Sequence, residues 1–419
     1  MTRRHENATI LSEPILWGSL VLRLVLWGWV LFTGFWRSGD THHYIWVSGV
    51  VCGGDWGGVW GRPTLYAWFL CLFSPYLKAK ATASSLVALP LFAQSLLLWI
   101  CGVVIWRLWP KVRSRRVITA LWVFDPVLLV FGAVIMSDAV FSILAFAVAV
   151  AGWKVWTQSQ SSKNLGYVAA LGALLGLLIL TRSVGLPILV WSAVFALVFF
   201  RRRLHFLLVG VVTAMAVMAP QIYWNGTRHS TWSVLQQGGW FQTVVGVVEY
   251  HDTGVDFYEA EARWVKDPRN GAPGETVRIL TQKAPTFIYL TAKGIARVLF
   301  GHVNVDWGAL LLGTAPVGPG WFKVPEVRVG PQIKGVWVVP WVLGILLTLS
   351  LSLFTYWRTL RALMAAGLDA FSIWALGCIA LLAATPLLWG DARFRASVWP
   401  FILVLWAASE GRALKKKKI

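Results

Sequence analysis

Hydrophobic runs long enough to cross a membrane recur along most of this chain, and charged residues fall mainly in the short gaps between them. A membrane-spanning helix needs about 20 predominantly apolar residues, because the hydrocarbon layer is about 30 Å thick. Of the 419 residues, 57% are hydrophobic and only 13% are charged. This hydrophobic share exceeds what an ordinary soluble domain requires. We therefore expect an all-α integral membrane protein that forms a single domain over residues 1–419.

Ten hydrophobic segments are predicted to cross the membrane. They cover residues 15–35, 84–106, 117–136, 138–156, 165–181, 183–200, 204–221, 336–356, 370–389 and 397–410. One continuous helix over 165–200 would be too long for the bilayer. We divide it at Arg182, because Gly185 and Pro187 are residues typical of turns.

The gaps between the predicted spans alternate in charge, and this alternation indicates how the chain is oriented. Basic residues occupy every second gap and both terminal segments: Arg3, Arg4, Lys111, Arg113, Arg115, Arg116, Arg201, Arg202, Arg203, Arg358, Arg361 and Lys415 to Lys418. Short cytoplasmic loops are rich in Lys and Arg, so ten spans place both termini in the cytoplasm. Orientation then explains much of the formal net charge of +20, and we expect no nucleic-acid partner.

The remaining gaps face the opposite side and include two long segments, 36–83 and 222–335. Within the second, apolar and basic side chains over 276–300 predict amphipathic helices that lie along the membrane surface. The rest of 222–335 is rich in Gly and Pro and is predicted to form ordered loops. The four cysteines, Cys52, Cys71, Cys101 and Cys378, show no CxxC or metal-binding spacing, so we expect them to be packing residues.

Two aspartates are predicted on the face opposite the basic gaps. Asp40 follows the first span within the stretch Ser38 to Tyr44, and Asp138 follows Ser137 between the third and fourth spans. Either acid could simply cap a helix, because Asp is a favoured N-cap. Two carboxylates on one face could instead share the roles of general base and orienting group, or hold a divalent metal ion. We predict Asp40 and Asp138 as catalytic residues and as the candidate metal ligands.

Three arginines are predicted on the same face as the two acids. Arg182 lies at the tip of its hairpin, and Arg393 and Arg395 lie between the last two spans. An arginine at a helix end often only anchors that end at the membrane interface. A guanidinium group also matches phosphate oxygens in a partly dehydrated site, so we predict an anionic phosphate as the ligand of these three. Asp125 is predicted inside the third span and must face protein or water, but the sequence suggests no role for it.

Several short elements follow one another in a characteristic order. They are Gly39-Asp40-x-x-x-Tyr44, Arg62-Pro63-x-Leu65-Tyr66, Pro126 through Gly132 to Ser137-Asp138, Gly172 through Gly176 to Thr181-Arg182, Pro220 through Trp224-Asn225, and Arg393-Phe394-Arg395 through Pro400. This set resembles the GT-C class of polytopic glycosyltransferases. It is most similar to the bacterial branch related to protein O-mannosyltransferases and to the aminoarabinose transferase of lipid A. The resemblance covers residues 15–240 and the last 30 residues.

The resemblance implies a polyprenyl-phosphate sugar donor and an inverting transfer to a hydroxyl of a lipid, glycan or protein at the outer membrane face. It implies that Asp40 is the general base and that Asp138 matches a second acidic position, where related enzymes often carry Glu. Many relatives have Asp-Glu in the first loop, whereas Thr41 follows Asp40 in this chain.

The remaining site residues are assigned on the same basis. Arg393, Arg395 and Arg182 are expected to stabilise the leaving phosphate, because developing negative charge there needs cationic groups. We expect Tyr44, Arg62 and Tyr66 to line the substrate pocket. The amphipathic part of 222–335 is expected to cover the site and exclude water, which would otherwise hydrolyse the donor.

Two other functions fit a polytopic membrane protein. A lipid or solute transporter or flippase would predict charges along several spans or inverted repeats with broken helices. A non-catalytic scaffold would explain the topology, but not the acids and arginines gathered on one face. Glycosyl transfer explains that gathering best. The compact size and short loops favour the bacterial plasma membrane over the endoplasmic reticulum.

Overall fold

The computed structural model describes residues 13–33, 39–54, 63–73, 84–157, 164–199, 204–234, 240–251, 257–270, 272, 274–301, 307, 315–316, 329–330, 338–386 and 392–416. Within these ranges nearly all regular structure is helical, as the hydrophobic pattern predicted. The exception is a parallel pairing of two short strands, β1 (Ala315–Pro316) and β2 (Val329–Gly330).

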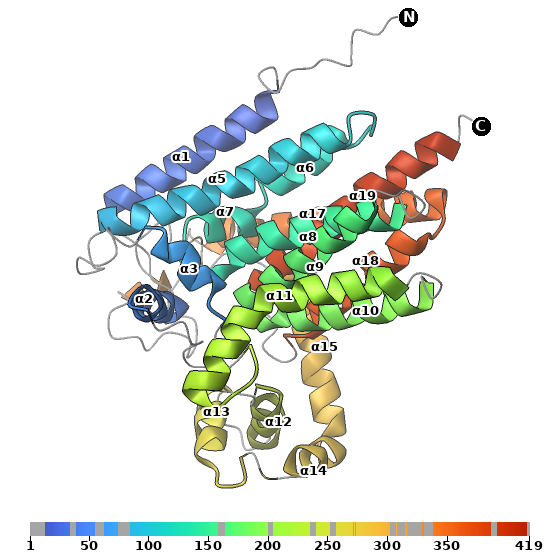
Figure 1. The fold of residues 1–419 in the computed structure, drawn as a ribbon. Coiled ribbons are helices and arrows are strands. Elements are labelled where there is room, and N and C mark those ends of the chain that lie inside the picture. The colour runs from blue at the N-terminus through green and yellow to red at the C-terminus, as the bar shows by residue number, and fades with distance from the viewer. Residues whose placement is uncertain are drawn as a thin grey trace, which may run out of the picture.

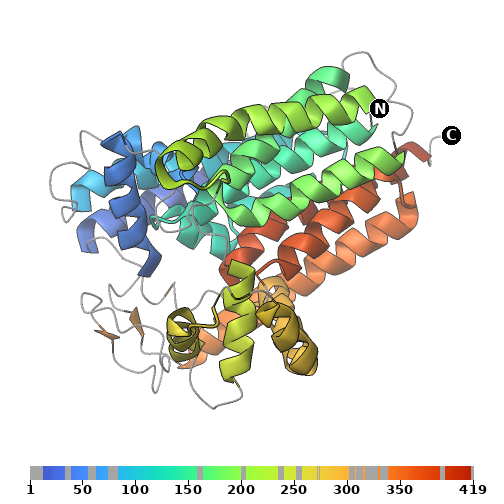
Figure 2. The same cartoon turned by 60° about the horizontal axis from the view of Figure 1, so that its bottom comes forward.

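Long helices lie side by side and form the main body of the molecule (Figures 1 and 2). These helices are α1 (Pro14–Thr33), α5 (Ser84–Leu108), α8 (Ser137–Thr157), α9 (Asn164–Thr181), α10 (Leu186–Phe199), α11 (Leu204–His229), α17 (Val338–Ala366), α18 (Ala370–Ala384) and α19 (Arg395–Lys416). The shorter α2 (Gly39–Cys52) and α3 (Leu65–Cys71) lie at one end of this body, and a lobe of helices α12 to α15 projects beyond it (Figure 1).

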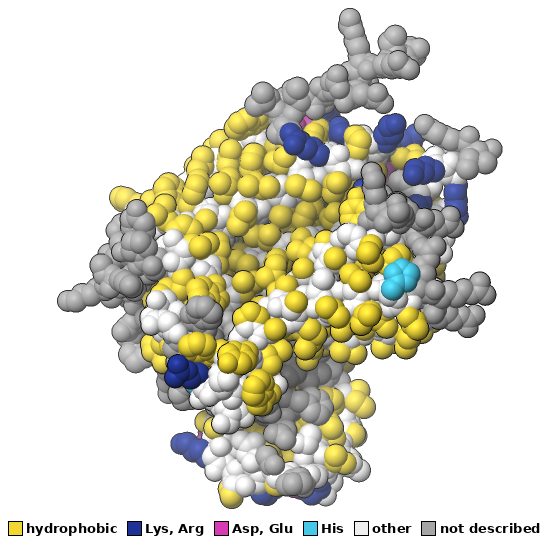
Figure 3. Space-filling model, viewed as in Figure 1, with side chains coloured by type: hydrophobic (Ala, Val, Ile, Leu, Met, Phe, Trp, Pro, Cys, Tyr) yellow, Lys and Arg dark blue, Asp and Glu magenta, His cyan; other side chains and the backbone are white. Residues whose placement is uncertain are grey.

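Six helices in the described part of the chain are long and apolar enough to cross a membrane. They are Pro14–Phe32, Ala88–Leu108, Ser137–Thr157, Asn164–Thr181, Leu204–His229 and Val342–Ala366, with shorter apolar helices at Ser183–Phe199 and Ala370–Ala384. Their outward faces carry large exposed apolar side chains such as Val198 and Leu208, each 63% exposed, and Figure 3 shows such side chains along the sides of the body. These surfaces are those of a multi-pass integral membrane protein, because lipid rather than water is the solvent that suits them. The full count of ten spans stays a prediction.

Basic residues gather at the end of the body where α1 begins and α19 ends (Figure 3). At this basic end, Arg116 pairs with Glu13 at 3.4 Å, and Arg358 of α17 donates to the hydroxyl of Ser114 at 2.9 Å. The backbone amide of Ser114 also donates to Glu410 of α19 at 3.3 Å. Basic segments between the predicted spans, which the charge pattern assigned to one side of the membrane, therefore lie together at one end of the molecule.

The predicted span at 117–136 is wrong as a single helix. The structure has α6 (Arg115–Val123) and then α7 (Pro126–Gly132), with Asp125 between them. Pro126 has no backbone N–H to continue α6, and it suits the first position of a new helix. The Asp125 carboxylate caps that helix by accepting from the amides of Val127 and Leu128 at 2.9 and 3.1 Å.

Buried side chains provide hydrogen bonds at the break between α6 and α7. Arg23 of α1 donates to the carbonyl of Val123 and to the hydroxyl of Ser95, both at 3.3 Å. Arg395 of α19 donates to the free oxygen of Asp125 at 2.9 Å. A buried helix break requires such internal partners, because backbone groups shielded from water must be hydrogen-bonded within the protein.

The hairpin predicted around Arg182 is confirmed. Helix α9 ends at Thr181, a 3-10 turn η3 (Ser183–Gly185) follows, and α10 returns alongside. Helix α9 packs closely on α11, where a Cβ atom added to Gly172 would lie 2.2 Å from the carbonyl oxygen of Gly210. Only glycine permits this approach of the two helices.

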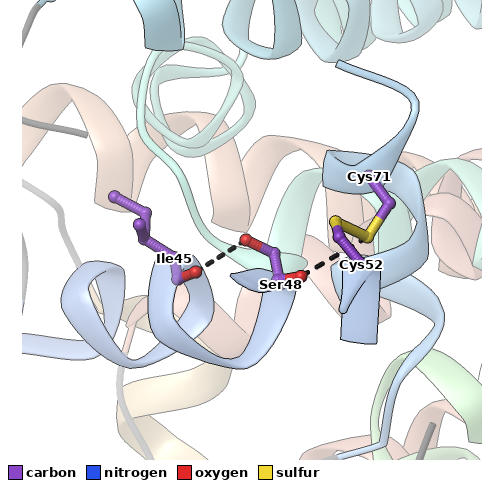
Figure 4. The surroundings of a disulfide bond; sticks show 4 residues. All are labelled: Ile45, Ser48, Cys52 and Cys71. Atoms are coloured by element: carbon purple, nitrogen blue, oxygen red, sulfur yellow. Dashed lines mark hydrogen bonds between the residues drawn. A yellow bond between two sulfur atoms is a disulfide. The ribbon is translucent and has the colours of Figure 1, made fainter. Parts of the chain in front are cut away.

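The cysteines divide into two kinds. Cys101 and Cys378 are buried and free, as expected of packing residues. For Cys52 and Cys71 that expectation is wrong, because they form a disulfide between the last residues of α2 and α3 (Figure 4). The carbonyl oxygen of Ser48, in the last turn of α2, lies 3.5 Å from the sulfur of Cys71. The disulfide therefore fixes the two short helices to each other.

The lobe comprises α12 (Trp240–His251), α13 (Phe257–Lys266), α14 (Glu275–Gln282) and α15 (Ala284–Phe300). The helices predicted over 276–300 are confirmed, whereas α12 and α13 replace loops that the Gly and Pro content had predicted. Their apolar faces meet in a small core of Val244, Val247, Val248, Ala260 and Leu290. Burial of this core explains why the segment folds as helices.

Candidate active site

Asp138 lies in the first turn of α8 and is almost fully buried, with 1% of its side chain exposed. One of its carboxylate oxygens accepts a hydrogen bond from the guanidinium of Arg182, whose side chain is 14% exposed. The other oxygen is buried and has no hydrogen-bond partner among the described residues. A buried acceptor without a partner costs about 1–3 kcal/mol, so this oxygen is a candidate contact for a substrate or an ion.

Two arginines share one aromatic ring beside this acid. The guanidinium carbon of Arg182 lies 4.7 Å from the centre of the Phe394 ring, and that of Arg393 lies 5.1 Å from it. Phe394 belongs to a 3-10 turn, η6 (Ala392–Phe394), which directly precedes α19. The ring holds the two cations in neighbouring positions, as cation–π attraction favours. The sequence predicted both arginines on the face of Asp138, and the structure brings Arg182 into direct contact with it.

Two tyrosines connect α2 and α3 to the start of α8. The hydroxyl groups of Tyr44 and Ser137 are hydrogen-bonded at 2.6 Å, and the rings of Tyr44 and Tyr66 meet edge to face at 5.0 Å. Burial raises the pKa of Tyr66 well above its ordinary value, and the nearby Tyr44 and Asp138 raise it further. Tyr66 therefore stays protonated and can act only as a neutral hydrogen-bonding group. Both tyrosines lie near Asp138, and the pocket-lining role expected of them stays a prediction.

Gln94 of α5 is a site residue that the sequence did not reveal. Its amide nitrogen donates to the backbone carbonyls of Phe131, Gly132 and Val134, at 3.0, 3.2 and 2.6 Å. Its amide oxygen accepts from the hydroxyl of Tyr66 at 3.1 Å. One buried amide therefore fixes both α3 and the segment that leads into Asp138.

Asp40 lies in the first turn of α2, but its side chain is outside the described residues, as is the whole of Arg62. The neighbouring Thr41 is described and buried, and its hydroxyl donates to the carbonyl of Ile135 at 3.1 Å. Ile135 precedes Asp138 by three positions. The first turn of α2 and the start of α8 therefore meet at the same end of the molecule, which we call the acid end.

Arg395 does not join Arg182 and Arg393 around Phe394. It is 1% exposed and bonded to Asp125, and its guanidinium carbon lies 4.1 Å from the centre of the Trp399 ring. Its Nε and one terminal nitrogen have no hydrogen-bond partner among the described residues. The contacts of Arg395 are therefore internal to the protein, and the phosphate-binding role predicted for it stays a prediction.

A divalent ion bound by oxygen ligands needs several of them. Within the described ranges no group of three or more His, Cys, Asp or Glu side chains could hold a metal ion. The free oxygen of Asp138 is a suitable donor, and its other oxygen is engaged by Arg182. The predicted pair of Asp40 and Asp138 stays untested, because one of its two side chains lies outside the described residues.

The fold is similar to that of a solved membrane glycosyltransferase. The archaeal oligosaccharyltransferase AglB from Archaeoglobus fulgidus, in complex with an inhibitory peptide and a dolichol-phosphate, matches with a TM-score of 0.51 and 15% identity. The match covers 96% of this chain and 50% of AglB, so this chain spans half the length of that protein. At this identity the match shows the fold alone.

Two crystal structures of ArnT from Cupriavidus metallidurans also align over most of the chain. The apo state matches with a TM-score of 0.39 and 15% identity, over 95% of this chain and 76% of ArnT. The form bound to undecaprenyl phosphate matches with a TM-score of 0.39 and 16% identity, over 96% of this chain and 78% of ArnT. No protein-family model and no curated protein sequence matches this chain.

Proposed function

We propose that this protein is an inverting glycosyltransferase that moves a sugar from a polyprenyl-phosphate donor to an acceptor hydroxyl at the acid end of the bundle. The observation that carries the proposal is the buried pair of Asp138 and Arg182, with Arg393 beside it on the ring of Phe394. This arrangement lies on a fold shared with AglB, a glycosyltransferase that was solved with a dolichol-phosphate.

The cations suit a phosphate leaving group. When the bond between the anomeric carbon and the phosphate oxygen breaks, the bonding electrons stay with the phosphate and its negative charge increases. Arg182 and Arg393 lie together and can stabilise that charge, which fixed cationic groups do most effectively in a site of low polarity. Arg395 acts differently in this proposal, because its ion pair with Asp125 supports the helix break.

The acids serve the attacking hydroxyl. As the acceptor oxygen bonds to the anomeric carbon, its proton passes to the carboxylate of Asp40, and the configuration at that carbon inverts. Asp138 orients the acceptor with its free oxygen, while its bound oxygen keeps Arg182 in place. Tyr44 and Tyr66 form the neutral wall of the pocket. Should a divalent ion take part, Asp40 and Asp138 would hold it, and it would supply positive charge next to the phosphate.

The disulfide supports the orientation of the site. Disulfides persist outside the reducing cytosol, so the bond between Cys52 and Cys71 supports an oxidising compartment for α2 and α3. The basic end would then face the cytoplasm, in line with the positive-inside rule. The acceptor would be a lipid, glycan or protein outside the cytoplasm, and the membrane itself would deliver the donor.

The test uses the full chain in lipid nanodiscs with radiolabelled polyprenyl-phosphate sugars and a membrane extract as the source of acceptors. We expect a new covalent radiolabelled product, and we expect Asp40→Asn to abolish it while the protein still folds. Exposed Glu259→Gln is the matched control and should leave transfer unchanged. Sugar movement across liposomes without a covalent product would instead identify a transporter and overturn the proposal.

A further inference from the structure

A cavity of about 200 Å³ lies beside the candidate active site and has no part in the chemistry proposed above. It lies between α3, α9 and α11 and is partly open, and its lining residues are Thr64, Leu65, Trp68, Leu180, Val217, Pro220 and Gln221. A single water molecule needs only about 10–15 Å³ of such space. The cavity therefore has room for a group much larger than one water.

Helix α3 forms the wall between this cavity and the acid site. Leu65 and Trp68 are three positions apart, so they share the face that lines the cavity. Tyr66 points to the other side, where it meets Tyr44 and Gln94. On α9, Leu180 lines the cavity just two positions before Arg182. A ligand in this cavity would lie next to the reacting groups without occupying their place.

The polar part of the cavity wall is neutral and fixed in position. Thr64, 2% exposed, donates from its hydroxyl to the amide oxygen of Gln221, which is 6% exposed. The amide nitrogen of Gln221 donates to Asn225 at 3.4 Å, and Asn225 donates to the carbonyl of Ser233 at 2.9 Å. The second proton of the Gln221 amide and the lone pairs of the Thr64 oxygen remain for a ligand within this network.

This combination points to a hydroxylated, uncharged ligand. A hydroxyl group can accept from Gln221 and donate to Thr64 at the same time, which neither an alkyl chain nor a phosphate can do. Trp68 adds a flat aromatic surface, 37% exposed, against which the apolar face of a ring can pack. The lining contains no Lys, Arg or His, whereas Arg182 and Arg393 lie together beside the ring of Phe394.

We infer that this cavity is a subsite for a neutral sugar ring belonging to the acceptor. That the ring belongs to an acceptor rests on the proposed function. That the cavity binds a neutral sugar ring does not. The partners proposed for the donor phosphate, Arg182 and Arg393, are not part of the cavity lining, so the sugar ring and the phosphate would bind in different places. The subsite would select acceptors that already carry a sugar.

The test is photo-crosslinking of the full chain in phosphatidylcholine nanodiscs. One probe is a hexyl β-glucoside with a diazirine group, and its matched partner is a hexyl phosphate with the same diazirine. We expect the glucoside to label peptides that contain residues 64–68 and 217–221, and octyl glucoside to compete. The double variant Thr64→Val/Gln221→Leu should lose about fivefold of this labelling, as expected for lost hydrogen bonds.

Two further variants keep the result interpretable. Thr213→Val makes the same chemical change on α11 away from the cavity, where the hydroxyl only bonds its own helix, and should label like the parent protein. Trp68→Ala removes the aromatic surface and keeps the side chains of Thr64 and Gln221, and should also lose labelling. Unchanged labelling in Trp68→Ala and in the double variant, or stronger labelling by the phosphate probe, would overturn the subsite. Because labelling needs no turnover, absence of sugar transfer would contradict the proposed function alone.

Discussion

The guanidinium of Arg182, at the turn between α9 and α10, donates to the carboxylate of Asp138 at the start of α8, although 44 positions separate them in the chain. The pair is enclosed, and the second oxygen of Asp138 is left without a partner among the described residues. A carboxylate held in this way is oriented before any substrate arrives. Such preorganisation is the property that active sites require.

Neutralising this acid should reduce transfer much more than it reduces stability. Asp138→Asn keeps the shape of the side chain but removes the charge that positions Arg182. We expect the transfer rate to fall by a factor of about 10²–10³, comparable to the loss of one fixed electrostatic group. The rate per folded protein is the measurement, and Glu259→Gln is the exposed control. A rate within twofold of the parent protein would remove Asp138 from the site.

Breaking the ion pair between Asp125 and Arg395 should instead reduce stability much more than it reduces transfer. Asp125→Asn can still cap α7, but it leaves the buried guanidinium of Arg395 without its counter-charge. Removal of one partner of a buried pair typically costs about 3–5 kcal/mol. The midpoint of thermal unfolding in detergent should fall, and the double variant Asp125→Asn/Arg395→Met, which keeps the cap, should recover much of the loss. A stable Arg395→Met that binds the donor poorly would instead support the phosphate role predicted for Arg395.

Gln94 is expected to position the acid site. Gln94→Leu keeps most of the volume but leaves the carbonyls of the segment before Asp138 without their shared donor, at about 1–3 kcal/mol for each buried group left unpaired. We expect a lower transfer rate together with a lower unfolding midpoint. Gln94→Glu separates the two effects, because it keeps the bond to Tyr66 and removes the bonds to the carbonyls. Equal activity of both variants with the parent would refute a positioning role.

Acid should loosen the lobe before it affects the bundle. Hydrogen bonds from Arg269 hold the pKa of Asp267 far below its usual range, and those from Arg278 lower the pKa of Glu275. A depressed pKa in the folded state stabilises the fold above the unfolded value, about 3.9 for Asp and 4.3 for Glu. That stabilisation is lost as the pH falls through the folded values, so the lobe should loosen below about pH 4.

The measurement is the fluorine-19 signal of a label on Val265→Cys, a position that is 58% exposed in α13. Its shift should change in a single step as the pH falls from 5 to 2. Arg269→Gln/Arg278→Gln should shift the step to higher pH, because the carboxylates then lose the partners that depress their pKa values. An identical pH step with and without the arginines would contradict this account.

Reduction of the disulfide should weaken the acid end. The bond between Cys52 and Cys71 closes a loop with a sequence separation of 19, for which the chain-entropy model gives about 3 kcal/mol. A reductant that reaches the bond should lower both the unfolding midpoint and the transfer rate. The variant Cys52→Ser/Cys71→Ser should show the same loss and no further response to reductant. A parent protein whose unfolding midpoint and transfer rate do not respond to reductant, with the two new thiols confirmed by alkylation and mass spectrometry, would count against it.

The sequence was informative wherever one local pattern decided the structure. Long apolar runs gave most of the helices of the bundle, and Gly185 with Pro187 marked the turn after Arg182. The break at Asp125 and Pro126 had a local signal too, because an acid before proline is typical of a helix start. The hydrophobicity of the surrounding segment concealed that signal.

The remaining features depend on distant parts of the chain. The pairing of Cys52 with Cys71 requires that α2 and α3 pack together, which cysteine spacing does not specify. Gln94 looks like an isolated polar residue within a span, and its partners lie about 40 positions later. The pattern placed Asp138 and Arg182 on one face, but their contact follows from how α8 and α9 pack. The same holds for Arg395, whose buried partner is 270 positions away.

The last of these separations has a consequence for biosynthesis. Asp125 leaves the ribosome long before Arg395 has been made, and 270 residues at 5–20 residues per second take roughly 15–50 s. During that interval the nascent chain holds an acid among hydrophobic segments without its eventual counter-ion. Factors that shelter such a residue would therefore matter more for the yield of this protein than its hydrophobic composition suggests.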